Sequence, residues 1–362
     1  MKKRVAIVHD WLIGMRGGEY VLDAILELYP DADIFTLFYN KEKINKNINS
    51  HRIITSDLNK NFLIRKYYKY FLHRFPVEIE KFDLQDYDLI ISSSHCVAKG
   101  VIPNPESIHF SYVHTPMRYI WDQYYNYFKN FGYLKKKFID KKLNYLRLWD
   151  VASSNRVDYF IANSNFVSKR IEKFYKRDSK VIHPPVDIGF FTPDSIQRED
   201  FYLSVNALVP YKRVDLLIKA FNKSGKNLMV IGDGSEYKRL RSMANSNIVF
   251  IKSLKRDELR DYYRRAKALV FAGIEDFGIS FVEAQATGLP VIAYNSGGVR
   301  DIVIDKKTGL LFESQDEEEI VETVKEFETL KFDKQEIIAN SLRFSKKRFL
   351  EEFGSFIKSK TK

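Results

Sequence analysis

Short apolar runs alternate with amphipathic stretches along the 362-residue chain, and glycine or proline stands between many of them. The apolar runs predict buried strands and the amphipathic stretches predict helices. The first series of predicted strands comprises residues 4–9, 34–37, 89–92, 108–113 and 159–163. The second comprises residues 202–206, 228–232, 248–252, 268–272, 291–294 and 310–312. Strands that alternate with helices in this way predict an α/β fold built from doubly wound parallel sheets.

The segment Ile182-His-Pro-Pro-Val-Asp187 separates the two series of strands. Its two prolines bar a helix and favour a hinge. We therefore expect a first Rossmann-like domain over residues 1–185 and a second over residues 186–343. In open α/β sheets ligands bind beyond the carboxyl ends of the strands, so the sequence predicts two facing sheets with a cleft between the domains.

Composition agrees with a two-domain globular protein, because 45% of the residues are hydrophobic and the length exceeds what one core usually serves. The apolar run after Met1 ends at His9 and Asp10, so we interpret it as a strand and not as a signal peptide. No apolar run is long enough to predict a membrane-spanning helix. The single cysteine, Cys96, rules out an internal disulfide and suits a reducing cytoplasm.

The formal net charge of +12 indicates an anionic partner, and the excess is concentrated in the first half of the chain. Residues 59–74 contain no acid, and at helical spacing Arg65, Lys69 and His73 line one side, while Leu63, Tyr67, Tyr70 and Phe71 line another. A second basic and aromatic region covers residues 129–149 and includes Phe131, Tyr133 and Lys135. Three interpretations remain open: an anionic membrane surface, a solvated helix face, and single-stranded nucleic acid, which no accompanying motif supports.

The most specific stretch is Glu275-Asp-Phe-Gly-Ile-Ser-Phe-Val-Glu283. If a helix begins near Gly278, Glu275 lies on the preceding loop and Glu283 on the second turn. The backbone N–H groups of Gly278, Ile279 and Ser280 then point at whatever lies between the two carboxylates, and such N–H groups bind phosphate well.

This segment resembles the E-x7-E signature of retaining nucleotide-sugar glycosyltransferases of family 4, which have the two-domain GT-B fold. The Gly288-Leu-Pro290 turn, the Gly297-Gly-Val299 loop and the later Thr308-Gly-Leu-Leu-Phe312 fit the same family. The resemblance implies that Glu283 binds the ribose hydroxyls and that Glu275, with the following amides, holds the sugar and phosphate. It also implies that the tail, residues 344–362, is a helix that returns to the first domain.

The resemblance places further donor-binding residues after other predicted strands. Lys212 would lie at the diphosphate and offset charge on the departing nucleotide, with Arg213 assisting. The family usually has an arginine five positions before this lysine, where this chain has Ala207. The turn at Gly17 and Gly18, which opens a helix after the first strand, favours an anion such as the donor diphosphate.

The segment Ser111 to Asp122 resembles its counterpart in bacterial mannosyltransferase-like enzymes of this family. His114 would then face the transferred sugar as a catalytic residue, and Arg118, Trp121 and Asp122 would shape the acceptor side. Asp31-Ala-Asp33 has the D-x-D form of metal-nucleotide sites, but it lies far in sequence from the other motifs. We expect no metal and no cofactor beyond the nucleotide sugar itself.

The function that the resemblance implies is transfer of a sugar, with mannose from GDP-mannose as the first choice, to a glycolipid or oligosaccharide acceptor with the anomeric configuration retained. The expected location is cytoplasmic, at the inner face of the cell membrane, in surface polysaccharide synthesis. The alternatives are a UDP-sugar-dependent transferase, a GT-B epimerase or phosphorylase, and a non-enzymatic basic protein that binds membrane or RNA.

Overall fold

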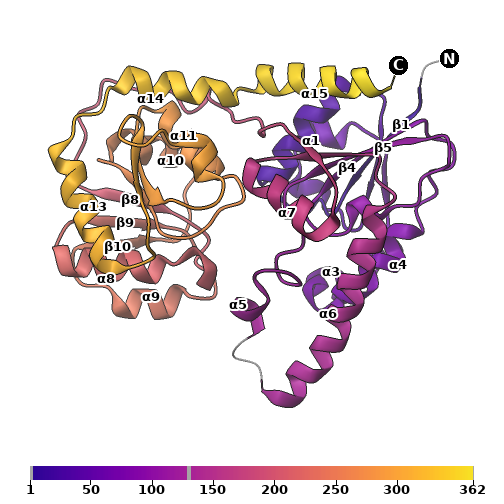
Figure 1. Cartoon of the computed structure of the whole chain (residues 1–362), viewed down its shortest axis with the longest axis horizontal. Coiled ribbons are helices and arrows are strands. Elements are labelled where there is room, and N and C mark those ends of the chain that lie inside the picture. Colours follow the sequence, from indigo (N-terminus) through magenta and orange to yellow (C-terminus); the bar gives the residue numbers. More distant parts are fainter. Residues whose placement is uncertain (1–2, 129–131, 362) are drawn as a thin grey trace. The chain divides into compact units, whose positions relative to one another are not determined.

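The computed structural model describes residues 3–128 and 132–361, which separate into two compact units (Figure 1). Residues 1–185 and 349–362 make up the first unit, and residues 186–348 the second. Lys129 to Phe131 of the second basic region lie outside the described residues, as do the side chains of Tyr133 and Lys135. Among the helices described, none combines the length and the apolar character needed to cross a bilayer.

The first unit contains a seven-stranded parallel sheet in the order β3-β2-β1-β4-β5-β6-β7. Its strands are β1 Val5–His9, β2 Asp33–Thr36, β3 Ile53–Thr55, β4 Leu89–Ser94, β5 Ile108–Val113, β6 Tyr159–Ala162 and β7 Ser179–Val181. Its α-helices are α1 Gly17–Leu28, α2 Lys46–Asn49, α3 Phe62–Lys66, α4 Phe75–Glu80, α5 Tyr124–Phe128, α6 Tyr133–Ser154 and α7 Asn165–Tyr175. Short 3₁₀ segments include η3 Tyr68–Arg74 and η4 Ala98–Gly100.

The second unit contains a six-stranded parallel sheet in the order β10-β9-β8-β11-β12-β13. Its strands are β8 Tyr202–Val205, β9 Leu228–Ile231, β10 Ile248–Ile251, β11 Leu269–Phe271, β12 Val291–Tyr294 and β13 Gly309–Phe312. Its helices are η5 Pro210–Lys212, α8 Val214–Ser224, α9 Tyr237–Met243, α10 Arg256–Arg265, α11 Ile279–Ala286, α12 Val299–Ile302, α13 Glu317–Thr329, α14 Lys334–Ser341 and η6 Leu342–Phe344. The long helix α15, Lys346–Lys360, carries the chain from this unit into the first.

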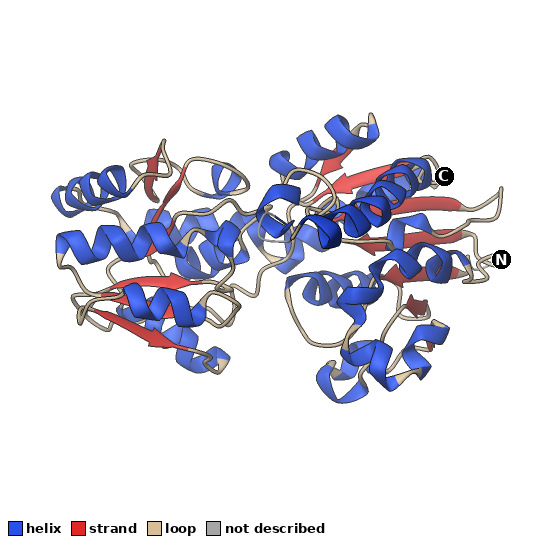
Figure 2. Cartoon of the chain, turned by 90° about the horizontal axis from the view of Figure 1, so that it is seen from below, coloured by secondary structure: helices blue, strands red, loops and turns tan. Residues whose placement is uncertain are grey.

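Helices cover both faces of each sheet, as Figure 2 shows. Alternation along a strand explains why hydrophobic cores lie on both faces of each sheet, because neighbouring side chains point to opposite faces. In β1, Ala6 and Val8 pack into one core, while Ile7 packs into the other beside α1 and the phenylalanines of α15. Most residues of the buried strands are apolar, as expected for parallel sheets covered on both sides, although β4 ends with three buried serines. The prediction of two doubly wound parallel sheets is therefore confirmed.

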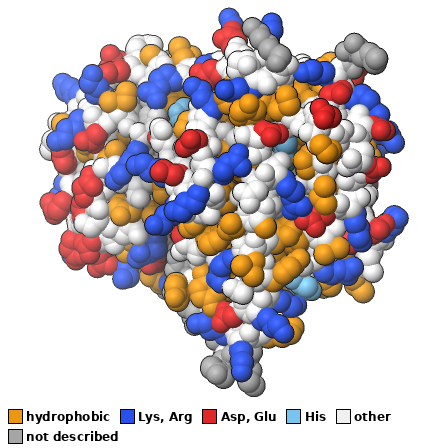
Figure 3. Space-filling model, turned by 45° about the vertical axis from the view of Figure 1, so that its right-hand side comes forward, with side chains coloured by type: hydrophobic (Ala, Val, Ile, Leu, Met, Phe, Trp, Pro, Cys, Tyr) orange, Lys and Arg blue, Asp and Glu red, His pale blue; other side chains and the backbone are white. Residues whose placement is uncertain are grey.

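Two details of the prediction are wrong. The edge strands β3 and β7 were not predicted, because each has only three residues and their side chains are only partly buried or exposed. Residues 59–74 do not form one α-helix, since α3 ends at Lys66 and the chain continues as a 3₁₀ segment. With three residues per turn the predicted apolar side is broken up, and Tyr70 is 79% exposed. Apolar and basic side chains lie intermixed on the face that Figure 3 shows.

Candidate functional site

The loop between β11 and α11 is held by close backbone contacts. Gly273 lies against the backbone of Lys212, where a Cβ atom would come within 2.8 Å of the lysine Cα. Further along, Glu275 forms a parallel bridge with Gly297, and the Gly298 N–H donates to the Glu275 carbonyl at 2.8 Å. Two glycine loops are thus needed to bring this segment beside β8 and β12, which explains the glycines of the motif.

Helix α11 begins where the sequence predicted. Gly278 precedes it with φ of +100°, a conformation that glycine adopts without strain, and Ile279 is the first helical residue. The first turn leaves the N–H groups of Ile279 and Ser280 without intrahelical acceptors. Glu275 lies before this turn and Glu283 on the second turn, so the predicted placement of the two carboxylates is confirmed. Their roles toward a ligand stay predictions.

Lys212 and Glu275 form an ion pair between Nζ and Oε1, although the two residues are 63 positions apart. Lys212 ends η5 directly after β8 and is only 6% exposed. Its ammonium group lies 5.2 Å from the centre of the Tyr211 ring and 5.6 Å from that of Phe271. Sequence reasoning placed both residues at the donor but did not foresee the pair. The result is a cation with little solvent around it, beside the start of α11.

Arg213 follows Lys212 with φ of +51°, and its Nε donates to Asp215 at 3.3 Å. This contact orients the guanidinium toward the first turn of α8. Ala207, at the position of the family's usual arginine, is exposed. The proposed role of Arg213 as the second cation stays a prediction.

Glu283 has a partner that the sequence analysis missed. The phenol of Tyr263, a fully buried side chain on α10, donates to Glu283 Oε2 at 3.2 Å. Burial raises the pKa of Glu283 from 4.5 to about 7, against the lowering effects of Tyr263 and Arg256. Burial also raises the pKa of Tyr263, so the phenol keeps its proton and can serve as the donor. Only the fold brings these positions together, since no motif connects them.

The raised pKa predicts that Glu283→Gln stabilises the ligand-free protein at pH 8. Below about pH 4.5 the carboxyl group is protonated in the folded and unfolded chains alike, so its ionisation does not lower the free energy of unfolding. Between about 4.5 and 7 only the folded state keeps the proton, so stability falls as pH rises, and the full cost is present above 7. We expect a difference on the order of 1–3 kcal/mol, allowing for solvent screening. Urea unfolding of both proteins at pH 5 and pH 8 measures it, and an equal pH dependence in the two proteins would contradict the prediction.

In the first unit three histidines meet at the carboxyl edge of the sheet. His9 ends β1, His95 follows β4 and His114 follows β5, and their ring centres are 6.1 to 6.5 Å apart. Ser93 Oγ lies 2.8 Å from His114 Nε2. Burial, helped by the other two imidazoles, holds the pKa of His114 well below its ordinary value. His114 is therefore a neutral imidazole, suited to hydrogen bonding rather than to acting as a cation.

The glycine pair lies next to this cluster. Gly17 and Gly18, predicted as a turn that opens a helix, are the first two residues of α1. A Cβ atom on Gly18 would lie 3.5 Å from both His114 and His9, so the structure brings two predicted site residues, Gly18 and His114, together. The sequence analysis did not include His9 and His95 among the site residues. A signal was available, since His9 ends the predicted strand 4–9 and His95 follows the predicted strand 89–92 by three residues.

Asp10 fixes the loop that carries His95. One carboxylate oxygen accepts the N–H groups of His95 and Cys96 at 2.6 and 2.9 Å, and the other accepts those of Val97 and Ala98 at 2.6 and 2.8 Å. Asp10 is fully buried, so these four donors replace its hydration. The carboxyl ends of β1 and β4 are thereby tied together.

The predicted acceptor residues Trp121 and Asp122 have protein partners. The Trp121 indole N–H donates to Asp150 at 2.8 Å, and its ring stacks on Phe174 at 4.8 Å. Asp122 accepts from Arg170 at 2.5 Å. The Arg118 carbonyl accepts the N–H of Trp121 at 3.2 Å. A hollow of about 550 Å³ is lined by Trp121 and Asp122 among others, but the acceptor role of Arg118, Trp121 and Asp122 stays a prediction.

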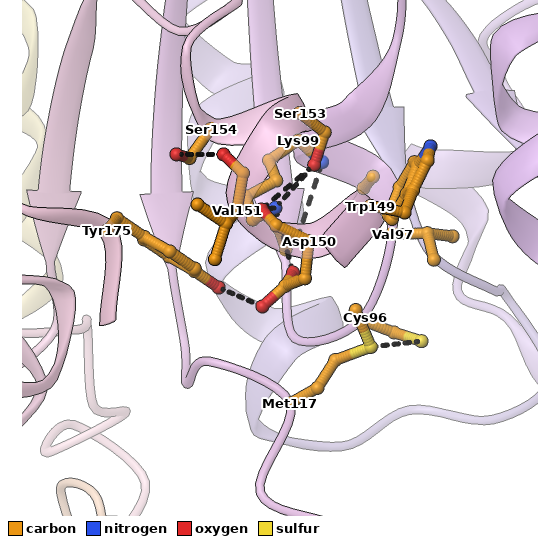
Figure 4. Close-up of polar contacts among 12 residues, drawn as sticks. Cys96, Val97, Lys99, Met117, Trp149, Asp150, Val151, Ser153, Ser154 and Tyr175 are labelled. Carbon is orange, nitrogen blue, oxygen red and sulfur yellow. Dashed lines mark hydrogen bonds and ion pairs between the residues drawn. The ribbon is translucent and has the colours of Figure 1, made fainter. Parts of the chain in front are cut away.

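Asp150 belongs to a buried ion pair with Lys99 (Figure 4). Lys99 Nζ lies 2.8 Å from Asp150 Oδ1 and donates to the Asp150 carbonyl and to Ser153 Oγ, each at 2.8 Å. The other carboxylate oxygen accepts from Tyr175 at 3.0 Å as well as from Trp121. The pair thus joins η4, α6 and α7 to the segment that follows β5.

Metal ligands were also sought. Across residues 3–128 and 132–361 no group of three or more His, Cys, Asp or Glu side chains is arranged to hold a metal ion. Asp33 of the D-x-D sequence instead accepts from the Tyr87 phenol at 2.5 Å. Metal-independent chemistry stays a prediction.

The match to a known protein family falls in the second unit. Residues 190–343 match the family model described as Glycosyl transferases group 1. An uncharacterized glycosyltransferase of Methanocaldococcus jannaschii is 32% identical over 195 residues, which are 52% of this chain and 55% of that protein. A GDP-mannose-dependent alpha-(1-6)-phosphatidylinositol monomannoside mannosyltransferase of Mycobacterium tuberculosis is 30% identical over 174 residues, 40% of this chain and 45% of the relative. The chain spans about half the length of the curated relatives it matches.

Solved structures resemble the whole chain. The lipopolysaccharide outer core galactosyltransferase WaaB superposes with a TM-score of 0.71 at 16% identity, covering 99% of both chains. Anabaena HepE in complex with UDP and glucose gives 0.70 at 16% identity, covering 99% of this chain and 100% of that one. At such identity the likeness shows the shared fold alone.

Proposed function

We propose, from the premise that residues 190–343 form a domain of the glycosyl transferases group 1 family within a GT-B fold, that the protein transfers a sugar from a nucleoside diphosphate sugar to an acceptor. The finer part of the proposal is an α-mannosyltransferase that uses GDP-mannose and retains the anomeric configuration. The acceptor is a glycolipid or oligosaccharide at the inner face of the cell membrane. Neither a metal ion nor a further cofactor takes part.

The Lys212–Glu275 pair beside the first turn of α11 carries this proposal. A shielded ammonium group and outward-pointing N–H groups suit a diphosphate, because both act on charge that grows as the nucleotide leaves. Glu275 holds Lys212 in place and offers a second oxygen to a sugar hydroxyl. Glu283, held by Tyr263, is placed one helical turn further along to accept from ribose hydroxyls. In this proposal these groups contact the sugar, the diphosphate and the ribose of the nucleotide sugar.

The proposed chemistry needs no covalent intermediate. The bond between the anomeric carbon and the diphosphate oxygen breaks, and the acceptor hydroxyl forms its bond to that carbon on the same face. The proton of the hydroxyl passes to the departing diphosphate, whose charge Lys212 offsets. We keep neutral His114 as a hydrogen-bond partner for the transferred sugar. Its low pKa makes it unsuitable as the proton donor at neutral pH.

Two comparisons bear on the donor nucleotide, and they favour different donors. Mannose from GDP-mannose is favoured because the mycobacterial relative named as GDP-mannose-dependent shares 30% identity with this chain. UDP-sugars are the alternative, since HepE, which shares the fold at 16% identity, was solved with UDP and glucose. A related epimerase or phosphorylase would use the same donor contacts with a different second substrate.

Incubation of the purified protein with labelled GDP-mannose and a lipid extract from the source cells tests the proposal. We expect label in the organic phase, release of GDP, and a product whose anomeric carbon–proton coupling in NMR shows retention; added EDTA should leave the rate unchanged. An epimerised donor without acceptor would instead show an epimerase, and mannose 1-phosphate formed with inorganic phosphate would show a phosphorylase. Turnover with UDP-sugars alone would discard mannose as the donor sugar.

A further inference from the structure

Exposed apolar side chains are concentrated in two segments of the first unit. Among the described residues 17 large hydrophobic side chains are exposed, and 11 of them lie within residues 62–77 and 125–151. The most exposed include Tyr70, Leu148, Phe138 and Phe62, at 79%, 66%, 64% and 62%. Scattered single residues of this kind are ordinary, but a concentration marks an interaction surface.

The two segments lie side by side. Lys142 Nζ of α6 is 3.4 Å from His73 Nδ1 of η3. The inward-facing residues Ile64, Phe71 and Ile139 pack against the same core. We call the exposed residues of 62–70 and 137–148 the basic aromatic surface. The segments 62–70 and 137–148 are therefore held next to each other because both pack against the same core.

Helix α6 displays its part of this surface as a stripe. Phe138, Lys141, Tyr145 and Leu148 are exposed and follow one another at intervals of three and four, so they lie on one side of the helix. Leu143, Leu146 and Trp149 are buried on the other side. The stripe thus consists of apolar residues that the fold leaves in water although the same helix buries others well.

Charge on the surface has one dominant sign. Residues 59–74 carry five Lys or Arg and no acid, and α6 carries six against two acids, of which Asp150 is buried. Arg65, Lys66 and Lys69 are exposed among the aromatic rings, and Lys142 Nζ lies 4.6 Å from the Phe138 ring centre. A second copy of the chain would bring two positive surfaces together. The charge therefore selects an anionic partner.

We propose that the basic aromatic surface docks on a bilayer rich in anionic lipid, with the rings and leucines entering the headgroup region and the cations meeting lipid phosphates. Exposed Leu63 and Leu148 favour a bilayer over single-stranded nucleic acid, because bases stack on aromatic rings and gain little from aliphatic side chains. This proposal rests on the membrane location given under the proposed function and names the protein surface that contacts the membrane. Membrane binding by this surface depends neither on binding of the sugar donor nor on sugar transfer.

Co-sedimentation with vesicles tests the docking, using phosphatidylcholine alone or mixed with phosphatidylglycerol. The apolar variant combines Phe62→Ser, Tyr70→Ser, Phe138→Ser and Leu148→Ser; the charge variant combines Lys66→Gln, Lys69→Gln, Lys137→Gln and Lys141→Gln. A matched control on the second unit combines Val249→Ser, Ile304→Ser and Leu342→Ser, which are also exposed. Thermal unfolding checks that all variants fold.

We expect the wild type and the control to bind anionic vesicles equally, with weakening by salt, and both surface variants to bind at least tenfold more weakly. No binding of the wild type, equal loss in the control, or binding to single-stranded RNA in place of vesicles would overturn the docking. Nucleotide binding is measured separately without vesicles, so failure here leaves the transferase proposal standing.

Discussion

Lys212→Met is expected to lower the rate of sugar transfer by about 10²–10³-fold, the usual effect of removing a group that stabilises charge in the transition state. We do not expect Arg213 to replace the ammonium group, because its Nε donates to Asp215, and Ala207 carries no charge. Methionine keeps most of the side-chain volume between Tyr211 and Phe271. Steady-state kinetics under donor saturation measure the effect, since the loss is expected in kcat more than in KM.

A double-mutant cycle distinguishes a loss of activity caused by destabilisation from one caused by the missing charge at the diphosphate. Lys212→Met leaves the Glu275 carboxylate without its cation, and Glu275→Gln leaves the ammonium group without its anion, so each single change destabilises the second unit. The double variant leaves neither charge behind and should recover much of the stability. If Lys212 acts on the departing diphosphate, the double variant stays inactive. Recovery of activity together with stability would contradict the assigned role.

Lys99→Met is expected to destabilise the protein by about 3–5 kcal/mol, a large part of the stability of an ordinary domain. Both charges of the pair are buried, with Asp150 fully so, and removal of the cation leaves an uncompensated carboxylate among Tyr175 and Trp121. Urea unfolding, followed by a probe in the first unit, measures the loss.

A matched variant shows whether the buried charge is the cause. Lys99→Met combined with Asp150→Asn removes both charges and keeps an oxygen that can accept from Trp121 and Tyr175. We expect it to be more stable than Lys99→Met alone. If the two variants are equally unstable, loss of packing around the lysine, and not the unpaired carboxylate, explains the effect.

The sequence analysis correctly predicted those features of the site that depend on residues close together in the chain. The start of α11 at Gly278 and the places of Glu275 and Glu283 followed from spacing and from a glycine at the helix start. The Lys212–Glu275 pair, the Tyr263–Glu283 hydrogen bond and the anchoring of Trp121 on Asp150 did not, because each joins residues that only the folded chain brings together.

For residues 59–74 the helical periodicity of the sequence predicted the wrong conformation. Their composition correctly indicated a basic and aromatic exposed segment, while helical periodicity gave the wrong sides, because the chain changes from an α-helix to a 3₁₀ segment near Tyr67. Phe62 and Tyr70 lie exposed there, while Ile64 and Phe71 are partly buried against the core, so the buried and exposed side chains do not follow one helical period. The surface role of the segment follows from exposure and charge in the structure, not from its period.

Isothermal titration of the protein with GDP-mannose, GDP, UDP-glucose and UDP, beside Glu283→Gln as a folded control, tests the central claim most directly. The account predicts saturable binding of GDP-mannose and GDP by the wild type, weaker binding by Glu283→Gln, and a rise in thermal stability of the wild type with ligand concentration. Selective binding of the UDP compounds would change the donor and keep the enzyme class. Absence of binding by every nucleotide would contradict the claim that the second unit is a nucleotide-sugar site.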